Sequence, residues 1–104
     1  MGAINYLNVS SFDTTLVTSM KNAFYDCWNL TYLNLSSFRT NKVAQMDYMF
    51  ANCYNLINLD ISNFNSFSAN TQGIFENVTH LKIITSKDEK ICNLKPIGSK
   101  CIEN

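Results

Sequence analysis

The chain repeats itself with a fixed period, and this period constrains its fold more than any other feature. The stretch FYDCWNLTYLNLSSF at residues 24–38 returns as FANCYNLINLDISNF at residues 50–64, which sets a 26-residue period. A period of about 20 to 50 residues is typical of an array whose units bury their apolar residues against one another. The columns that keep this period are Leu7, Leu33 and Leu59; Val9, Leu35 and Ile61; Phe12, Phe38 and Phe64; Val17 and Val43; Met20 and Met46; Phe24 and Phe50; Cys27 and Cys53; Leu30 and Leu56.

Each unit contains two apolar patterns. The text LxxLxLxxF alternates apolar residues at period two, as at Leu33 and Leu35, and this predicts a short strand. The text VxxMxxxF is spaced by three and four, as at Val43, Met46 and Phe50, and this predicts one or two turns of helix. We therefore predict an α/β repeat solenoid that is right-handed and leucine-rich-repeat-like. Its short parallel strands lie at about 5–9, 31–36 and 57–62, with short helical or irregular segments on the convex side.

The units and a tail divide the chain. Three units occupy residues 1–84, at about 4–32, 33–58 and 59–84, and the third is one residue short near Gln72, which replaces Met. With that deletion, Phe75, Val78, Leu81 and Ile84 return to the columns, and Val78 replaces Cys. We expect residues 85–104 to cap the last unit, because a stack of units leaves an apolar cross-section at its end. The tail residues expected to be buried against Leu81 and Ile83 or Ile84 are Ile91, Leu94, Ile97 and Ile102.

The stretch LNLSSFRTNKVAQMDYMFANCYNLINLDISNF at residues 33–64 resembles a known repeat. It is similar to the 26-residue repeat of bacterial surface proteins, a branch of the BspA-like leucine-rich repeats, and the resemblance covers residues 4 to about 84. The resemblance implies a surface-displayed array that is used for adhesion or for binding host and neighbouring-cell proteins. It implies no enzyme.

Composition limits the partners. The formal net charge is zero and only 15% of residues are charged, so no basic surface for nucleic acid or an anionic membrane is expected. No apolar run reaches the roughly 18 residues of a membrane span, and the first ten residues lack the pattern of a signal peptide. The chain holds 15 asparagines, and chance alone can supply most of its Asn-x-Ser/Thr sequons, at Asn8, Asn29, Asn34 and Asn77.

Cysteine and histidine give weak signals for chemistry. Cys27 and Cys53 share a column among Phe and Leu, so we expect core thiols rather than a ligand or redox pair. Cys92 and Cys101 flank a stretch with Pro and Gly. We expect them to form a capping disulfide in an oxidising compartment and to remain free thiols in a reducing one. His80 is the only histidine and falls in the column of two asparagines, so we expect a surface residue. We predict no metal site, no cofactor and no enzyme.

The outward-facing residues are the candidate binding surface. On the strands we expect them at Tyr6, Tyr32, Asn34, Asn58 and Asp60. Trp28 and Tyr54 share a column just before the strands, and such residues are frequent at binding hot spots, although they can instead cover the rim of the core.

Two functions fit these features. The first is a non-enzymatic protein-binding or adhesion module whose partner is a protein or, as the second choice, a glycan; its location at the cell surface or outside the cell follows from the resemblance alone. The alternative is a structural spacer or self-assembling unit. Its first strand, at Ile4 to Val9, carries no charge or proline to prevent pairing with another chain, which favours this alternative or a longer parent protein.

Overall fold

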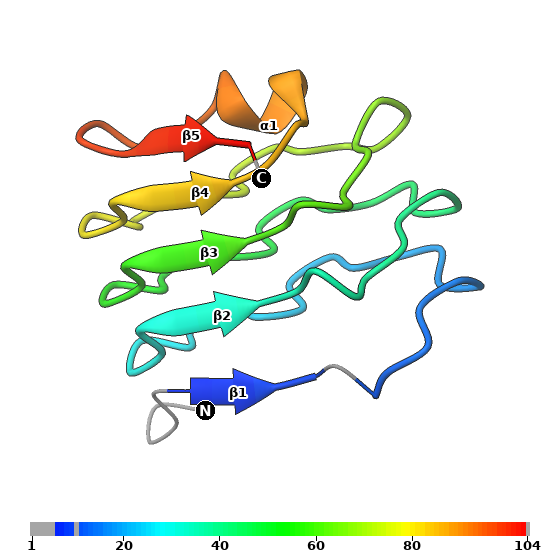
Figure 1. The fold of residues 1–104 in the computed structure, drawn as a ribbon, viewed down its shortest axis with the longest axis horizontal. Coiled ribbons are helices and arrows are strands. Elements are labelled where there is room, and N and C mark those ends of the chain that lie inside the picture. The colour runs from blue at the N-terminus through cyan, green and yellow to red at the C-terminus, as the bar shows by residue number, and fades with distance from the viewer. Residues whose placement is uncertain (1–5, 10, 104) are drawn as a thin grey trace.

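A computed structural model describes residues 6–9 and 11–103, which form an all-parallel sheet beside a single short helix (Figure 1). The strands are β1 (Tyr6–Asn8), β2 (Tyr32–Asn34), β3 (Asn58–Asp60), β4 (Ile83–Thr85) and β5 (Lys100–Ile102), and the helix is α1 (Glu89–Cys92). The strands lie side by side in chain order, and every neighbouring pair is parallel. The α/β class and the parallel pairing predicted from the sequence are confirmed.

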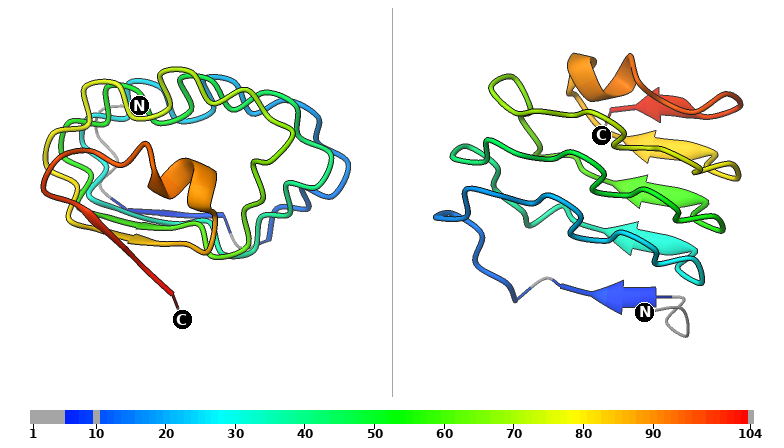
Figure 2. Two further views of the ribbon diagram at one scale, coloured as in Figure 1. Left: turned by 90° about the horizontal axis from the view of Figure 1, so that it is seen from above. Right: turned by 180° about the vertical axis from the view of Figure 1, so that it is seen from behind.

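The register of the strands follows the sequence period. Leu7 lies beside Leu33, and Leu33 beside Leu59, so both steps equal one full period, whereas the next step, from Leu59 to Ile84, is one residue shorter. We call each strand with its return segment a coil. In Figure 1 the strands run to the right in front, the return segments run back behind them, and the chain rises from β1 to β5, so the crossovers are right-handed. Seen from above, the coils lie over one another (Figure 2). Their buried apolar side chains form one core cluster.

The helices predicted in the return segments are absent from the described residues. Their backbone N–H groups donate instead to the next coil at every second residue, for example Met20 to Gln45 O at 2.8 Å and Phe24 to Met49 O at 2.9 Å. The residues between them make short-range turn bonds, such as Ala23 N to Met20 O at 3.1 Å. Left-handed residues break any helix in two columns. These residues are Asn22, Tyr48 and Gly73 in one column, and Asp26, Asn52 and Asn77 in the other.

The interior contains the predicted columns, with one exception. The three rings of the phenylalanine column stack, with centroids 5.9 Å apart between Phe24 and Phe50 and 5.8 Å between Phe50 and Phe75. Phe12, in contrast, is 60% exposed, so its prediction as a core residue is wrong. Its column is buried in the next two coils and open in the first, where no described coil precedes it.

The deletion in the third unit lies earlier than predicted. Ala69 N bonds to Ser66 O as Val43 N bonds to Thr40 O, so the third unit is still one full period from the second at this point. The bridge from Gln45 to Asn70 is one residue shorter than the period. The missing residue therefore follows Ala69, and Thr71, rather than Gln72, stands in the methionine column.

The last coil is short and closes one end of the stack. α1 lies across this end (Figure 2). Its residue Ile91 is fully buried against the core. A disulfide between Cys92 and Cys101 joins the end of α1 to β5, so this pair is bridged rather than free. The predicted burial of the other tail residues is wrong, because Leu94, Ile97 and Ile102 are exposed. Ile91 and the partly buried Cys101 pack against the core at this end, and β4 and β5 pair through their backbones.

A column of buried hydroxyl residues links the coils and then the helix. Thr14 Oγ1 accepts from Arg39 N at 2.8 Å and donates to Arg39 O at 3.2 Å, and Thr40 makes the same pair of bonds with Asn65. In the third coil the column holds Ser66, whose N–H and hydroxyl donate to Asp88 at 2.6 and 3.0 Å. Asp88 is also the N-cap of α1, because its Oδ1 accepts from Ile91 N at 3.0 Å.

We predict that Asp88→Ala lowers the free energy of unfolding by roughly 1–3 kcal/mol, because it removes a helix cap and leaves Ser66 without its acceptor. Urea melts under non-reducing conditions measure this. Glu89→Ala is the matched control, since Glu89 is exposed on the same helix. Equal effects of the two substitutions would contradict the role of Asp88.

We predict that Gly73→Ala is more destabilising than Gly98→Ala. Both glycines have positive φ, at 64° and 89°, but a Cβ at Gly73 would collide with the ring of Tyr48, whereas nothing lies within 4 Å of one at Gly98. Both variants lose stability because alanine disfavours positive φ. The collision should lower the free energy of unfolding of Gly73→Ala by about 1–3 kcal/mol more. Urea melts of both variants measure the difference, and Tyr48→Ala in the Gly73→Ala background should remove it. Equal melts of the two glycine variants would show that backbone strain alone sets the cost.

Candidate functional site

The sheet places the predicted strand residues in two columns. In one of these columns, side-chain oxygens are already used in hydrogen bonds to the backbone. Tyr32 lies beside Asn58 and Asn34 beside Asp60, all half-buried. The side-chain oxygens of Asn34 and Asp60 accept the backbone N–H of Ser36 at 2.9 Å and Ser62 at 3.0 Å. These two residues therefore bend the chain where each strand ends. The backbone of Tyr6 continues the first column, and its side chain lies outside the described part of the structure.

The two predicted aromatic residues project from the loops that precede the strands. Trp28 is 48% exposed and Tyr54 is 43% exposed, and they lie at equivalent positions of consecutive coils. Neighbouring strands lie about 4.8 Å apart, so the two residues form one continuous feature. We call this feature the aromatic edge, defined by Trp28 and Tyr54. About half of each residue is therefore shielded from solvent.

Side chains of the following coil hold the aromatic edge in place. Asn55 Nδ2 donates to Trp28 O at 2.8 Å, and His80 Nδ1 lies 2.7 Å from Tyr54 O. Because a carbonyl oxygen can only accept, His80 carries its proton on Nδ1 in this contact. The exposed position expected for His80 is observed. The carbonyl groups of this edge are thus anchored one coil further on, and the loops keep a fixed spacing.

A hollow of about 290 Å³ lies next to the aromatic edge. Sequence reasoning did not predict it, although three of its polar residues, Asn29, Asn55 and His80, share one column. It combines amide, hydroxyl and imidazole groups with Ile57, whose side chain is exposed. The residues that line it are Asn29, Thr31, Asn55, Ile57 and His80. A ligand here would meet hydrogen-bonding groups beside apolar surface.

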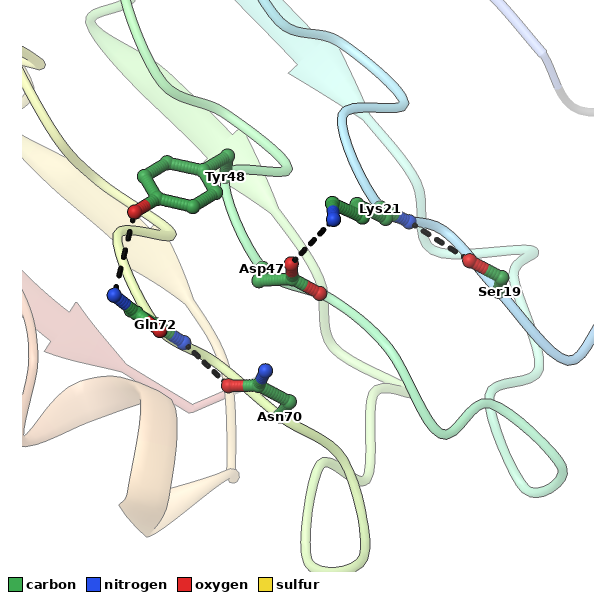
Figure 3. Close-up of polar contacts among 6 residues, drawn as sticks. All are labelled: Ser19, Lys21, Asp47, Tyr48, Asn70 and Gln72. Atoms are coloured by element: carbon green, nitrogen blue, oxygen red, sulfur yellow. Dashed lines mark hydrogen bonds and ion pairs between the residues drawn. The ribbon is translucent and has the colours of Figure 1, made fainter.

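The return segments carry a second set of polar contacts (Figure 3). Lys21 Nζ lies 3.5 Å from Asp47 Oδ2, and Asp47 is buried while Lys21 is half-exposed. The other carboxylate oxygen of Asp47 is buried without a hydrogen-bond partner. In the next coil, Gln72 Nε2 donates to the hydroxyl of Tyr48 at 3.3 Å. These contacts join consecutive coils, and none pairs a nucleophile with a base.

The remaining cysteines are core residues. Cys27 and Cys53 are buried thiols outside any disulfide, as predicted, and Cys53 Sγ donates to Phe24 O at 3.2 Å. Burial raises the pKa of Cys53 to about 12, with a smaller contribution from Cys27 beside it, and burial also raises the pKa of Cys27. Within residues 6–9 and 11–103, no group of three His, Cys, Asp or Glu side chains is placed to hold a metal ion. In the same part of the chain, no helix has the length and apolar character to cross a membrane.

The fold and the site together define an α/β protein with an all-parallel sheet and an aromatic edge of loops. The profile of the family described as "Mycoplasma protein of unknown function, DUF285" matches residues 2–90, and the chain belongs to this family. Neither curated proteins nor solved structures gave a match.

We predict that the two core thiols do not react with maleimide in the native protein at pH 8. A pKa of about 12 leaves roughly one molecule in 10⁴ with a Cys53 thiolate at that pH, and the core excludes the reagent. Mass spectrometry should show no label in the native state and two labels per chain in guanidinium chloride without reductant. Rapid native labelling of either thiol would show that the coils open locally.

Proposed function

We propose that this chain is a non-enzymatic protein-binding or adhesion module and that it belongs to a repeat solenoid of the leucine-rich-repeat type. The sequence likeness to the BspA-like repeat supports the solenoid assignment, as do the nearly equal steps along the sheet from Leu7 to Leu33, Leu59 and Ile84. The proposed location is the cell surface or the extracellular space. The disulfide between Cys92 and Cys101 supports this location, because such bonds persist in oxidising compartments.

The observation that carries the binding function is the aromatic edge. Trp28 and Tyr54 are half-exposed at equivalent positions, and their loops are anchored by Asn55 and His80. Rigid, half-exposed aromatic side chains lose little conformational entropy on binding and bury a large area. This supports an interface that is already formed before the partner arrives.

The surroundings of the aromatic edge favour a protein over a glycan. Ile57 is exposed in the hollow beside the edge, and a central apolar and aromatic patch with amide groups around it is typical of protein interfaces. A glycan-binding groove would need several convergent polar groups to satisfy sugar hydroxyls. Here the Asn55 amide donates to Trp28 O and one ring nitrogen of His80 is bonded to Tyr54 O, so fewer of these groups are free for sugar.

We predict that Trp28→Ala with Tyr54→Ala lowers binding of the fluorescently labelled protein to cultured epithelial cells by about tenfold or more, as for hot-spot residues. Flow cytometry measures the binding. Phe67→Ala is the matched control, because Phe67 is 85% exposed and lies outside the aromatic edge and its hollow. Circular dichroism should show that both variants keep the fold.

Treatment of the cells before binding separates the partner classes. Trypsin should abolish binding, and glycosidases should leave it unchanged. The reverse pattern would identify a glycan. Equal binding by the double variant and the wild type would overturn the aromatic edge as the binding surface.

A further inference from the structure

The helix and the strand of the C-terminal cap are held in different ways. α1 is tied to the third coil by side chains, since Asp88 accepts from Ser66 and Lys90 Nζ donates to Ser66 O at 3.1 Å. Its residue Ile91 is fully buried. In contrast, no residue in the range 92–103 is buried. The helix therefore has contacts with the core that the strand lacks.

A cysteine takes the place of an apolar core residue in β5. The column of fully buried residues in the middle of β2, β3 and β4 ends in Cys101, which is only partly buried. The other two residues of β5 are exposed. The backbone bonds between β4 and its partner include Lys100 N to Lys82 O at 3.0 Å and Ser86 N to Ile102 O at 2.9 Å. Such bonds contribute little net stability, because a released strand replaces them with bonds to water. Burial of apolar side chains, which holds the other strands, is nearly absent from β5.

The disulfide is the link that keeps β5 at the sheet. It joins Cys92, at the end of α1, to Cys101 over a sequence separation of 9. Without it, the anchored helix is connected to β5 only by the loop that contains Pro96 and Gly98, in which every residue is exposed or half-buried. Segments with few buried contacts open locally at a small cost in free energy.

The disulfide lies where a reductant can reach it. Both bridged cysteines are half-buried, and they line a hollow of about 180 Å³. The other residues that line it are Ser86, Lys87, Glu89 and Glu103. Cys27 and Cys53, in contrast, are buried in the core. A thiol reagent in solution therefore meets the bridged pair first.

We propose that the disulfide between Cys92 and Cys101 is a redox switch that determines whether residues 93–103 are attached to the sheet. A dithiol attacks one sulfur as a thiolate, which breaks the S–S bond and forms a mixed disulfide, and its second thiol then displaces the other cysteine. Both cysteines become thiols with the two protons and two electrons of the dithiol, which itself becomes a disulfide. β5 then leaves the sheet, whereas α1 and the coils keep their contacts. The backbone groups on the outer side of β4 are left unpaired, and edges of this kind can pair with another chain.

The proposed location gives the switch a direction. In an exported chain, exchange with a small disulfide in the oxidising compartment reverses the reaction and attaches β5 to the sheet. This direction rests on the proposed function, whereas the release of β5 on reduction does not. Neither Trp28 nor Tyr54 lies in the released segment. The order of the tail and the binding to cells are therefore measured separately, and the two proposals fail separately.

Hydrogen exchange of single amides, measured by NMR on the full chain with and without dithiothreitol, tests the proposal. The amides of Ser86 and Lys100, which bond between β4 and β5, should exchange at least about tenfold faster after reduction. The amides of Met46 and Phe50, which join the second coil to the third, are the matched controls and should keep their rates. Unchanged rates at Ser86 and Lys100 would show that β5 stays attached without the disulfide. Equal acceleration at all four amides would show that the disulfide holds the whole fold, and either result would overturn the proposal.

The double substitution Cys92→Ser with Cys101→Ser repeats the test without a reductant. Serine is close to cysteine in size and cannot form the bridge, so the amides of Ser86 and Lys100 should exchange as they do in the reduced wild-type chain. Dithiothreitol should change none of the four rates in this variant. Rates equal to those of the oxidised wild-type chain would contradict the role of the disulfide.

Discussion

The structure depends on hydrogen bonds between the backbones of consecutive return segments. Alternate N–H groups, such as those of Met46 and Phe50, donate to the next coil at 2.8 and 3.1 Å, and the residues between them close short turns. A helix would use those donors internally and leave nothing to join the coils. The alternation requires left-handed residues at two places in each coil, which asparagine, aspartate and glycine provide at five of the six positions and Tyr48 at the sixth. The repeated asparagines of the chain therefore include residues that have a structural function.

This backbone register decides where the surface residues lie. Once the coils are in step, a residue type that recurs in one column forms a line across the stack, whether it is buried like the rings of Phe24, Phe50 and Phe75 or exposed like Trp28 and Tyr54. The anchoring of each loop by Asn55 or His80 from the next coil follows from the same register. An exposed column can change its residues without affecting the columns that hold the core. Such a stack can carry different binding surfaces on one framework.

The period predicted the parts of the structure that depend on neighbouring coils, namely the parallel strands and most of the core columns. It failed where a residue lacks the neighbour that the pattern implies, as at Phe12, and where the pattern stops, as at Leu94, Ile97 and Ile102. Spacing by three and four at Val43 and Met46 predicted a helix, but this spacing shows only which side chains point inward. A chain of alternating turns and bonds to the next coil places inward side chains at the same spacing. The role of Asp88 has no signature in the period, because Asp88 lies in the tail beyond the repeats, although its partner Ser66 stands in the column of Thr14 and Thr40. The hollow beside the aromatic edge was missed because the column of Asn29, Asn55 and His80 carries no motif that is typical of a pocket, and Thr31 and Ile57 belong to a different column.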